Sequence, residues 1–230
     1  MIRHTPPRWV YFGGLVLSLI AGAINAVGFL GQHHQALSHM TGSVTVLGME
    51  LARGNGATAL HALAILAAFF AGCLVSGIVI SQSSLRLGRR YGVVLSLESV
   101  ALFLAVYFLR DGAAIGYCLA AMACGLQNAM VTTYRGSTMR TTHMTGMITD
   151  LGITCGHFLR GATVDWFRFR IYGFLFLGFF AGGVIGTFGY GRFGYDTLLF
   201  PALLSGVTGI GYTLIKHFEL RQKNRERHVA

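Results

Sequence analysis

The residues best suited to chemistry in this chain lie in a stretch that occurs twice. The sequence reads SHMTGSVTVLG over residues 38–48 and THMTGMITDLG over residues 142–152, so histidine, methionine, threonine, glycine and a final Leu-Gly recur in register. An imidazole can bind a polar ligand or carry a proton near neutral pH. The paired histidines, His39 and His143, are therefore the first candidates for a functional site.

Residues in and around this repeat are candidates for binding a solute. Glycine lets a backbone approach a ligand closely, and hydroxyls and amides offer hydrogen bonds. The candidates are Asn25, His39, Thr41, Gly42, Ser43, Gln127, Asn128, His143, Thr145 and Gly146. Structural roles are open alternatives: helix capping by the threonines, locking of two halves by the histidines, and interhelical hydrogen bonds by the asparagines.

Two carboxyls fall inside apolar sequence and are candidates for proton coupling. Asp150 replaces the Val46 of the first copy, and Glu98 lies in a separate apolar run. Ionisable groups at membrane depth are costly and usually mark functional sites. The alternative for Glu98 is an internal ion pair or a protonated, hydrogen-bonded side chain.

The pattern does not favour metal or redox chemistry. His33 and His34 precede His39, but no cysteine or carboxylate lies nearby to complete a metal site. The four cysteines lie in apolar runs without metal-ligand spacing, so buried, reduced thiols without a disulfide framework are expected. We expect no metal, no cofactor and no catalytic residue.

The elements that hold these residues are predicted to be membrane helices. Only 11% of the residues are charged, against about 25% in a soluble domain. Apolar runs of about 20 residues, the length that spans a bilayer, recur along the chain. We therefore expect an all-α integral membrane protein with a single membrane domain over residues 1–230. The net charge of +10 lies between these runs and in the tail, so nucleic acid is not expected as a partner.

Eight segments are predicted, six of spanning length and two short. The long segments are Tyr11–Leu30, Ala57–Ile80, Val93–Leu109, Ala113–Val131, Phe174–Tyr190 and Leu198–Ile215, and the short ones are His39–Leu51 and His143–Phe158. Repeat one is assigned to residues 10–109, repeat two to 113–215 and a basic cytoplasmic tail to 216–230. The sequence FFAG at 69–72 and again at 179–182 extends the repeat. The spaced glycines Gly178, Gly182 and Gly186 serve either packing within the chain or dimerisation.

The distribution of positive charge favours six crossings. If both short stretches are re-entrant and both termini are cytoplasmic, 15 of the 18 Lys and Arg residues lie inside, leaving Arg53, Arg110 and Arg192 outside. If all eight segments cross, the split is 12 against 6. Cytoplasmic loops carry the excess of Lys and Arg. We therefore expect three crossings and one re-entrant half-helix per repeat, arranged as an inverted repeat.

These motifs resemble those of the YoaK-like family of bacterial inner-membrane proteins. The likeness rests on GAINA at 22–26, ALSHMTG at 36–42, GLQNA at 125–129 and THMTG at 142–146, and it covers the chain from Val10 to Ile215. The resemblance implies a multi-pass protein of the bacterial inner (plasma) membrane whose function is uncharacterised. It supplies neither a substrate nor a catalytic residue.

The expected function is that of a small secondary transporter or channel for a small polar or anionic solute, with proton coupling as an option. Helix N-termini carry partial positive charge and free N–H groups, so the site is placed between the two half-helix N-termini. The expected partners are the lipid bilayer, the solute and, optionally, a second copy of the chain. The alternative is a membrane scaffold or accessory subunit without its own substrate, and a membrane-embedded enzyme is less favoured.

Overall fold

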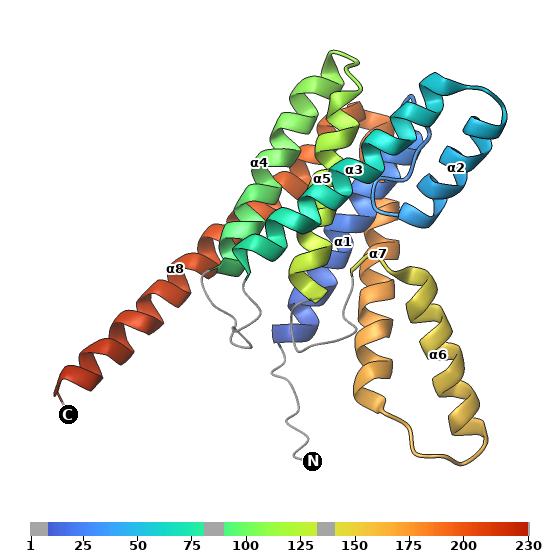
Figure 1. Ribbon diagram of the computed structural model, residues 1–230. Helices are drawn as coiled ribbons and strands as arrows, with labels where there is room; N and C mark the ends of the chain where they lie inside the picture. The colour runs from blue at the N-terminus through green and yellow to red at the C-terminus, as the bar shows by residue number, and fades with distance from the viewer. Residues whose placement is uncertain (1–8, 81–89, 133–140, 230) are drawn as a thin grey trace.

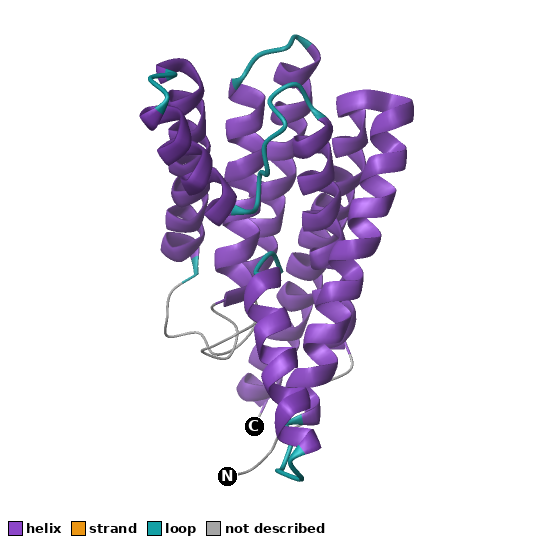
Figure 2. Ribbon diagram, turned by 90° about the vertical axis from the view of Figure 1, so that its right-hand side faces the viewer, coloured by secondary structure: helices purple, strands orange, loops and turns teal. Residues whose placement is uncertain are grey.

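The computed structural model of the protein describes residues 9–80, 90–132 and 141–229. Over these ranges it contains helices, turns and no strand (Figure 2). The elements are α1 (Trp9–Leu30), α2 (Met40–Ala52), α3 (Gly56–Val79), α4 (Arg90–Arg110), α5 (Ile115–Thr132), α6 (Met144–Leu159), α7 (Trp166–Phe193), the 3-10 helix η2 (Gly194–Leu198) and α8 (Leu199–Val229). The predicted all-α class is therefore confirmed.

Five helical stretches of the described residues are long and apolar enough to cross a membrane. They are Tyr11–Leu30, Gly56–Val79, Arg90–Arg110, Ile115–Thr132 and Trp166–Phe218, the last of which contains α7, η2 and much of α8. By contrast, α2 and α6 have 13 and 16 residues, fewer than the roughly 20 that a spanning helix needs. The architecture is that of a multi-pass membrane protein.

The long helices pair between the N-terminal and C-terminal halves of the chain. The main partner of α1 is α7, that of α3 is α5, and α4 packs against both α5 and α8. Figure 1 shows these helices as one bundle with α2 and α6 on its flank. Neither half therefore forms a separate unit.

Glycines bring these paired helices into backbone contact at matching positions. A Cβ atom on Gly182 would collide with the carbonyl oxygen of Leu19 in α1, and one on Gly72 would collide with the carbonyl oxygen of Met122 in α5. Gly178 and Gly186 also meet the backbone of α1. The spaced glycines of α7 are thus used in packing within the chain, because small residues let helix backbones approach closely.

The partner helices carry glycines that complete the match. A Cβ atom on Gly22 would collide with the carbonyl oxygen of Phe179, and one on Gly125 would collide with that of Phe69. These glycines occupy the first position of GAINA and of GLQNA, and the phenylalanines occupy the first position of the two FFAG sequences. The same sequence pair therefore makes the same helix contact twice.

The short helices α2 and α6 run from the middle of the molecule toward opposite ends (Figure 1). Each packs against the helix that follows it, α2 on α3 and α6 on α7, and within the described residues the two short helices do not contact each other. Figure 1 also shows the α2–α3 and α4–α5 turns at one end, with the α6–α7 turn and the two termini toward the other. The predicted basic residues at 3, 8, 86, 89, 135 and 140 lie outside the described residues.

Two predicted boundaries were wrong. Helix α7 begins at Trp166, eight residues before the predicted Phe174, because Asp165 caps it by accepting hydrogen bonds from the N–H groups of Phe167 and Arg168. Helix α8 continues to Val229, so the predicted tail is helical through residue 229. No glycine or proline occurs after Gly211 to interrupt that helix.

Candidate functional site

An asparagine fixes the segment that leads into each short helix. In the first copy, Asn25 Oδ1 accepts hydrogen bonds from the N–H groups of Leu37 (3.1 Å) and Ser38 (3.2 Å) and from Ser38 Oγ (3.1 Å). In the second copy, Asn128 Oδ1 accepts a hydrogen bond from Thr142 Oγ1 (3.1 Å). The asparagines of GAINA and GLQNA therefore hold equivalent residues, Ser38 and Thr142, immediately before the two histidines.

Gln127 attaches the second of these segments to α1. Its Nε2 donates to the Leu17 carbonyl (2.8 Å) and to Thr141 Oγ1 (2.9 Å). The neighbouring Ser18 donates through Oγ to the carbonyls of Thr141 (3.1 Å) and Leu175 (2.6 Å). Since Ser18 lies seven residues before Asn25 on α1, the two segments are held roughly 10 Å apart along that helix.

The short helices start at the histidines. His39 and His143 are the N-cap residues of α2 and α6, and neither forms a side-chain cap hydrogen bond. Of the alternatives for Thr41 and Thr145, helix capping does not apply, because each is the second residue of its helix and follows the N-cap histidine. The first N–H groups of both helices therefore have no side-chain cap.

In both copies of the repeat the glycine follows the histidine by three residues, which places it beside the imidazole on the first helical turn. A Cβ atom on Gly146 would collide with the imidazole of His143, and one on Gly42 would lie 3.7 Å from His39 Nδ1. Glycine at 146 therefore leaves room for His143 over the first helical turn, whereas at 42 a side chain would make only an ordinary contact with His39. Both histidines are exposed, whereas Ser43 is 1% exposed and its hydroxyl has no hydrogen-bond partner.

The two candidate carboxyls lie in different places. Glu98 is 0% exposed, and neither of its carboxyl oxygens has a hydrogen-bond partner. It faces Ser205 of α8 and Cys124 of α5 without meeting hydrogen-bond geometry with either. Asp150 is half-buried and lines a separate pocket of about 260 Å³ between α6 and the start of α7.

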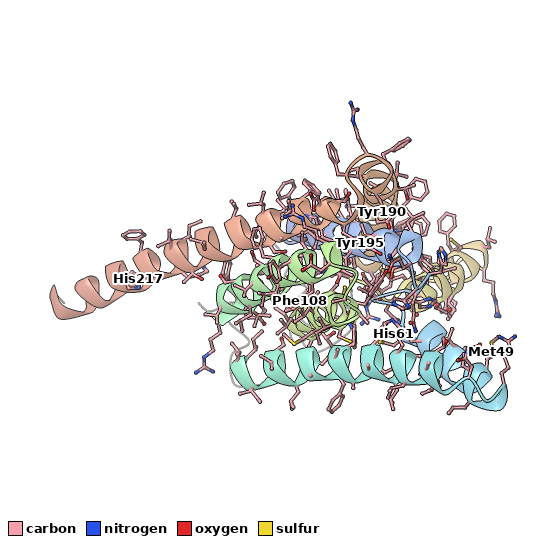
Figure 3. The ribbon with its side chains drawn as sticks, turned by 90° about the horizontal axis from the view of Figure 1, so that it is seen from above. Met49, His61, Phe108, Tyr190, Tyr195 and His217 are labelled. Atoms are coloured by element: carbon pink, nitrogen blue, oxygen red, sulfur yellow. The ribbon has the colours of Figure 1, made fainter. Side chains whose placement is uncertain are left out.

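A polar cluster that the sequence pattern did not indicate holds the α1–α2 connection. The rings of His33 and His61 stack with centroids 4.0 Å apart. Tyr195 Oη accepts a hydrogen bond from the N–H of Gln32 (3.1 Å), and Tyr117 Oη accepts one from the N–H of His33 (3.4 Å) and lies 2.7 Å from Tyr195 Oη. Figure 3 labels His61 and Tyr195 in the view onto this end of the molecule. The tyrosines have no counterparts in the repeat, so the duplicated pattern gave no signal for them.

The turns after the short helices share a second local pattern. Gly54 and Gly161 follow the C-cap arginines of α2 and α6, with φ angles of +73° and +71°. Asn55 and Asp165 then cap α3 and α7 through their side chains. The sequence signal for the end of each short helix was an Arg-Gly pair. A capping residue for the next helix follows it, Asn55 at once and Asp165 four residues after the glycine.

The cysteines are free thiols, but they are not uniformly buried. Cys124 is buried, Cys73 and Cys118 are half-buried, and Cys155 is exposed on α6. The expectation of burial was therefore wrong for Cys155, because among the described elements α6 packs on α7 alone and most of its residues are exposed. Over the described ranges, no group of three or more His, Cys, Asp or Glu side chains is placed to hold a metal ion.

Comparison with known proteins gives a family and no function. The chain matches the family described as "Protein of unknown function (DUF1275)" over residues 13–211. No curated protein and no solved structure matches it. The family match is consistent with the resemblance to YoaK-like membrane proteins. Because the family match covers most of the chain, the protein belongs to the DUF1275 family.

Proposed function

We propose that this protein is a small secondary transporter of the bacterial inner membrane that moves a small polar or anionic solute. In this proposal the chain is an inverted repeat in which each half contributes three crossings and one re-entrant half-helix, α2 or α6. The observation that carries the proposal is the matched pair of anchors, Asn25 with Ser38 and Asn128 with Thr142. They start two short helices that run in opposite directions (Figure 1), as broken helices do in transporters built from inverted repeats.

The packing of the long helices supports the same arrangement. In an inverted repeat, α1 corresponds to α5 and α3 to α7, so the contact of α1 with α7 should reappear as a contact of α5 with α3. Both contacts are present and use equivalent glycines, Gly22 with Gly182 and Gly125 with Gly72. Transporters of this kind move one repeat against the other around a central site.

The proposed solute site is at the starts of α2 and α6. Their first N–H groups lack side-chain caps, and the helix dipole makes each start partly positive. His39 and His143 are exposed beside these groups and can bind or protonate an anionic solute. The segments before α2 and α6 are held roughly 10 Å apart along α1. A solute between them can therefore contact each half of the protein separately.

Proton coupling is assigned to Glu98. Its carboxyl is buried among α4, α5 and α8 and forms no ion pair or hydrogen bond with the residues that the structure describes, and an ionisable group placed in this way is costly to keep. A transporter can use such a carboxyl by loading a proton when one side opens and releasing it when the other side opens. Asp150 lies in the α6–α7 pocket, which makes it the second candidate.

The transport proposal is tested by flux into proteoliposomes. Inorganic anions and small carboxylates serve as the probe set, and wild-type protein should accelerate the uptake of at least one of them. The double variant His39→Ala with His143→Ala should reduce that flux by about tenfold or more, which corresponds to roughly 1.4 kcal/mol. His157→Ala, which changes an exposed histidine of α6 outside the repeated motif, is the matched control. Absence of any flux, or full flux in the double variant, contradicts the proposal.

Glu98→Gln separates coupling from transport. The amide keeps the shape of the side chain and removes its proton exchange, so solute exchange at equal pH should persist while accumulation driven by a pH gradient should be lost. Asp111→Asn makes the same chemical change in the exposed α4–α5 turn and should leave accumulation intact. If the Glu98→Gln protein accumulates solute like wild type, Glu98 is not the coupling residue.

A scaffold or accessory subunit is the second candidate. Asn25, Asn128 and Gln127 all use their side chains to fix the backbone or a hydroxyl of neighbouring segments, which is the behaviour of structural residues. A folded protein without flux for any probe favours this alternative.

A further inference from the structure

A groove on the lipid-facing side of the α1–α7 contact is not explained by the proposed transport site. Its volume is about 540 Å³, within the range of roughly 300–1,000 Å³ of small-molecule sites. It follows α1 from Gly22 to Leu30, about 12 Å at the helical rise. The opposite wall is α7, including Phe180, Gly183 and Phe188.

One unpartnered hydrogen-bond donor lies in this apolar lining. The Asn25 side chain is 8% exposed, and its Oδ1 is occupied by the three donors of Leu37 and Ser38. Asn25 is one of the residues that line the groove, and among the described residues its Nδ2 group donates to no acceptor. An amide N–H that meets an apolar medium without an acceptor is costly, so the groove suits a ligand that supplies one.

The groove is open to the surroundings of α1 and α7. Phe29, Phe180 and Phe188 on its rim are 48%, 62% and 77% exposed, and both helices belong to stretches that are apolar enough to cross a membrane. In a bilayer, these rims meet lipid. Whatever fills the groove therefore comes from the lipid phase and must be mainly apolar.

At the corresponding place between α3 and α5, a cysteine takes the position of Gly183. Gly183 follows the second FFAG sequence, and Cys73 follows the first. A Cβ atom on Gly183 meets nothing within 4 Å, whereas Cys73 Sγ points to the Gly125 carbonyl of α5 at 3.4 Å. Glycine at 183 therefore leaves the groove beside it unfilled.

We infer that this groove binds a bilayer phospholipid, with one acyl chain along α1 and α7 and an ester carbonyl accepting a hydrogen bond from Asn25 Nδ2. An acceptor is the polar group that the lining requires, and no charged side chain lines the groove to pair with a headgroup. The inference shares Asn25 with the anchor of α2, but it uses the Nδ2 group and not the Oδ1 that holds Leu37 and Ser38.

The test uses full-length protein in vesicles of phosphatidylethanolamine and phosphatidylglycerol. These contain a trace of phosphatidylethanolamine with a photoreactive acyl chain, and crosslinked peptides are mapped by mass spectrometry. Crosslinks should concentrate on the peptides of residues 22–30 and 179–188. Gly183→Phe fills the groove and should lower them by about tenfold. Gly173→Phe is the control, because its Cβ atom also meets nothing within 4 Å and it lies on α7 outside the groove.

The hydrogen bond is tested separately. An ether-linked probe of the same chain length lacks the carbonyl and should crosslink less than the ester-linked probe in wild-type protein. Asn25→Asp keeps the oxygen that holds Leu37 and Ser38 and loses the N–H donors, so the preference for the ester should disappear. Even crosslinking over all lipid-facing helices, unchanged crosslinking in Gly183→Phe, or protein–protein crosslinks between two copies across the groove would overturn the inference.

Discussion

Asn25 and Asn128 occupy equivalent positions of the repeat but accept different numbers of hydrogen bonds. Both accept a hydrogen bond from the hydroxyl that precedes a histidine, but Asn25 also accepts two backbone N–H groups. The loop between α1 and α2 therefore depends more on its asparagine. In the second copy, Gln127 and Ser18 share the task by holding Thr141.

Substitution of the two asparagines should reveal this difference. Asn25→Ala leaves three donors without an acceptor and Asn128→Ala leaves one, so Asn25→Ala should cost roughly 2 kcal/mol more at about 1 kcal/mol for each hydrogen bond. Unfolding of the purified protein in a denaturing detergent series measures both. Equal losses of stability would show that the backbone hydrogen bonds of Leu37 and Ser38 contribute little.

At this scale the sequence predicted positions better than roles. Duplication located Asn25, Asn128, His39 and His143, because two matched copies are a signal that composition does not produce. It could not show that the histidine would be the N-cap, since helix starts depend on backbone angles set by the anchored segment before them. The role of Tyr117 could not be predicted for a different reason, because its contacts are with residues distant in the chain.

At the scale of helices, glycines determine which surfaces meet. Gly182 and Gly72 each lie against a carbonyl oxygen of the partner helix, whereas Gly183 and Gly77, on the same helices, face open space. Sequence spacing alone does not distinguish these two groups, because both lie in glycine-rich helices. The structure distinguishes the two groups by whether a Cβ atom at the glycine would meet the backbone of another helix.

Alanine substitution should therefore divide the glycines into two classes. Gly182→Ala and Gly72→Ala force backbone apart and should destabilise the protein by about 1–3 kcal/mol. Gly183→Ala and Gly77→Ala should be neutral or stabilising by up to about 1 kcal/mol, because alanine is the better helix former. Thermal unfolding in one detergent compares all four, and a similar loss in both classes would contradict the assigned contacts.

Helix positions were predicted well where apolar runs are bounded by turns and poorly where charge lies on a helix. The arginines before Phe174 looked like a loop, yet Trp166, Phe167 and Phe169 between them are helical once Asp165 caps the first turn. The duplicated Phe-Phe-Ala-Gly indicated a repeat. It could not identify α7 as the partner of α1, since pairing depends on contacts between distant parts of the chain.

At the scale of the whole molecule, the direction of the short helices distinguishes the six-crossing arrangement from eight crossings. The six-crossing model places the α2–α3 and α6–α7 turns on opposite sides of the membrane, and eight crossings place them on the same side. In a variant without the four native cysteines, Gly56→Cys should react with an impermeant maleimide added to intact cells. Ala162→Cys should react only after the membrane is opened. Labelling of both from the same side would contradict re-entrant short helices.

The pairing of α1 with α7 also has a consequence for biosynthesis. The surface of α1 that surrounds Gly22 is completed only by Phe179 and Gly183 of α7, which the ribosome makes long after α1. During translation, the first helix must remain in the membrane with its closest-packing face covered by lipid or by an insertion factor. Chains released before α7 is complete should therefore be substrates for membrane proteases, so quality control can act on this protein until its last third has been synthesised.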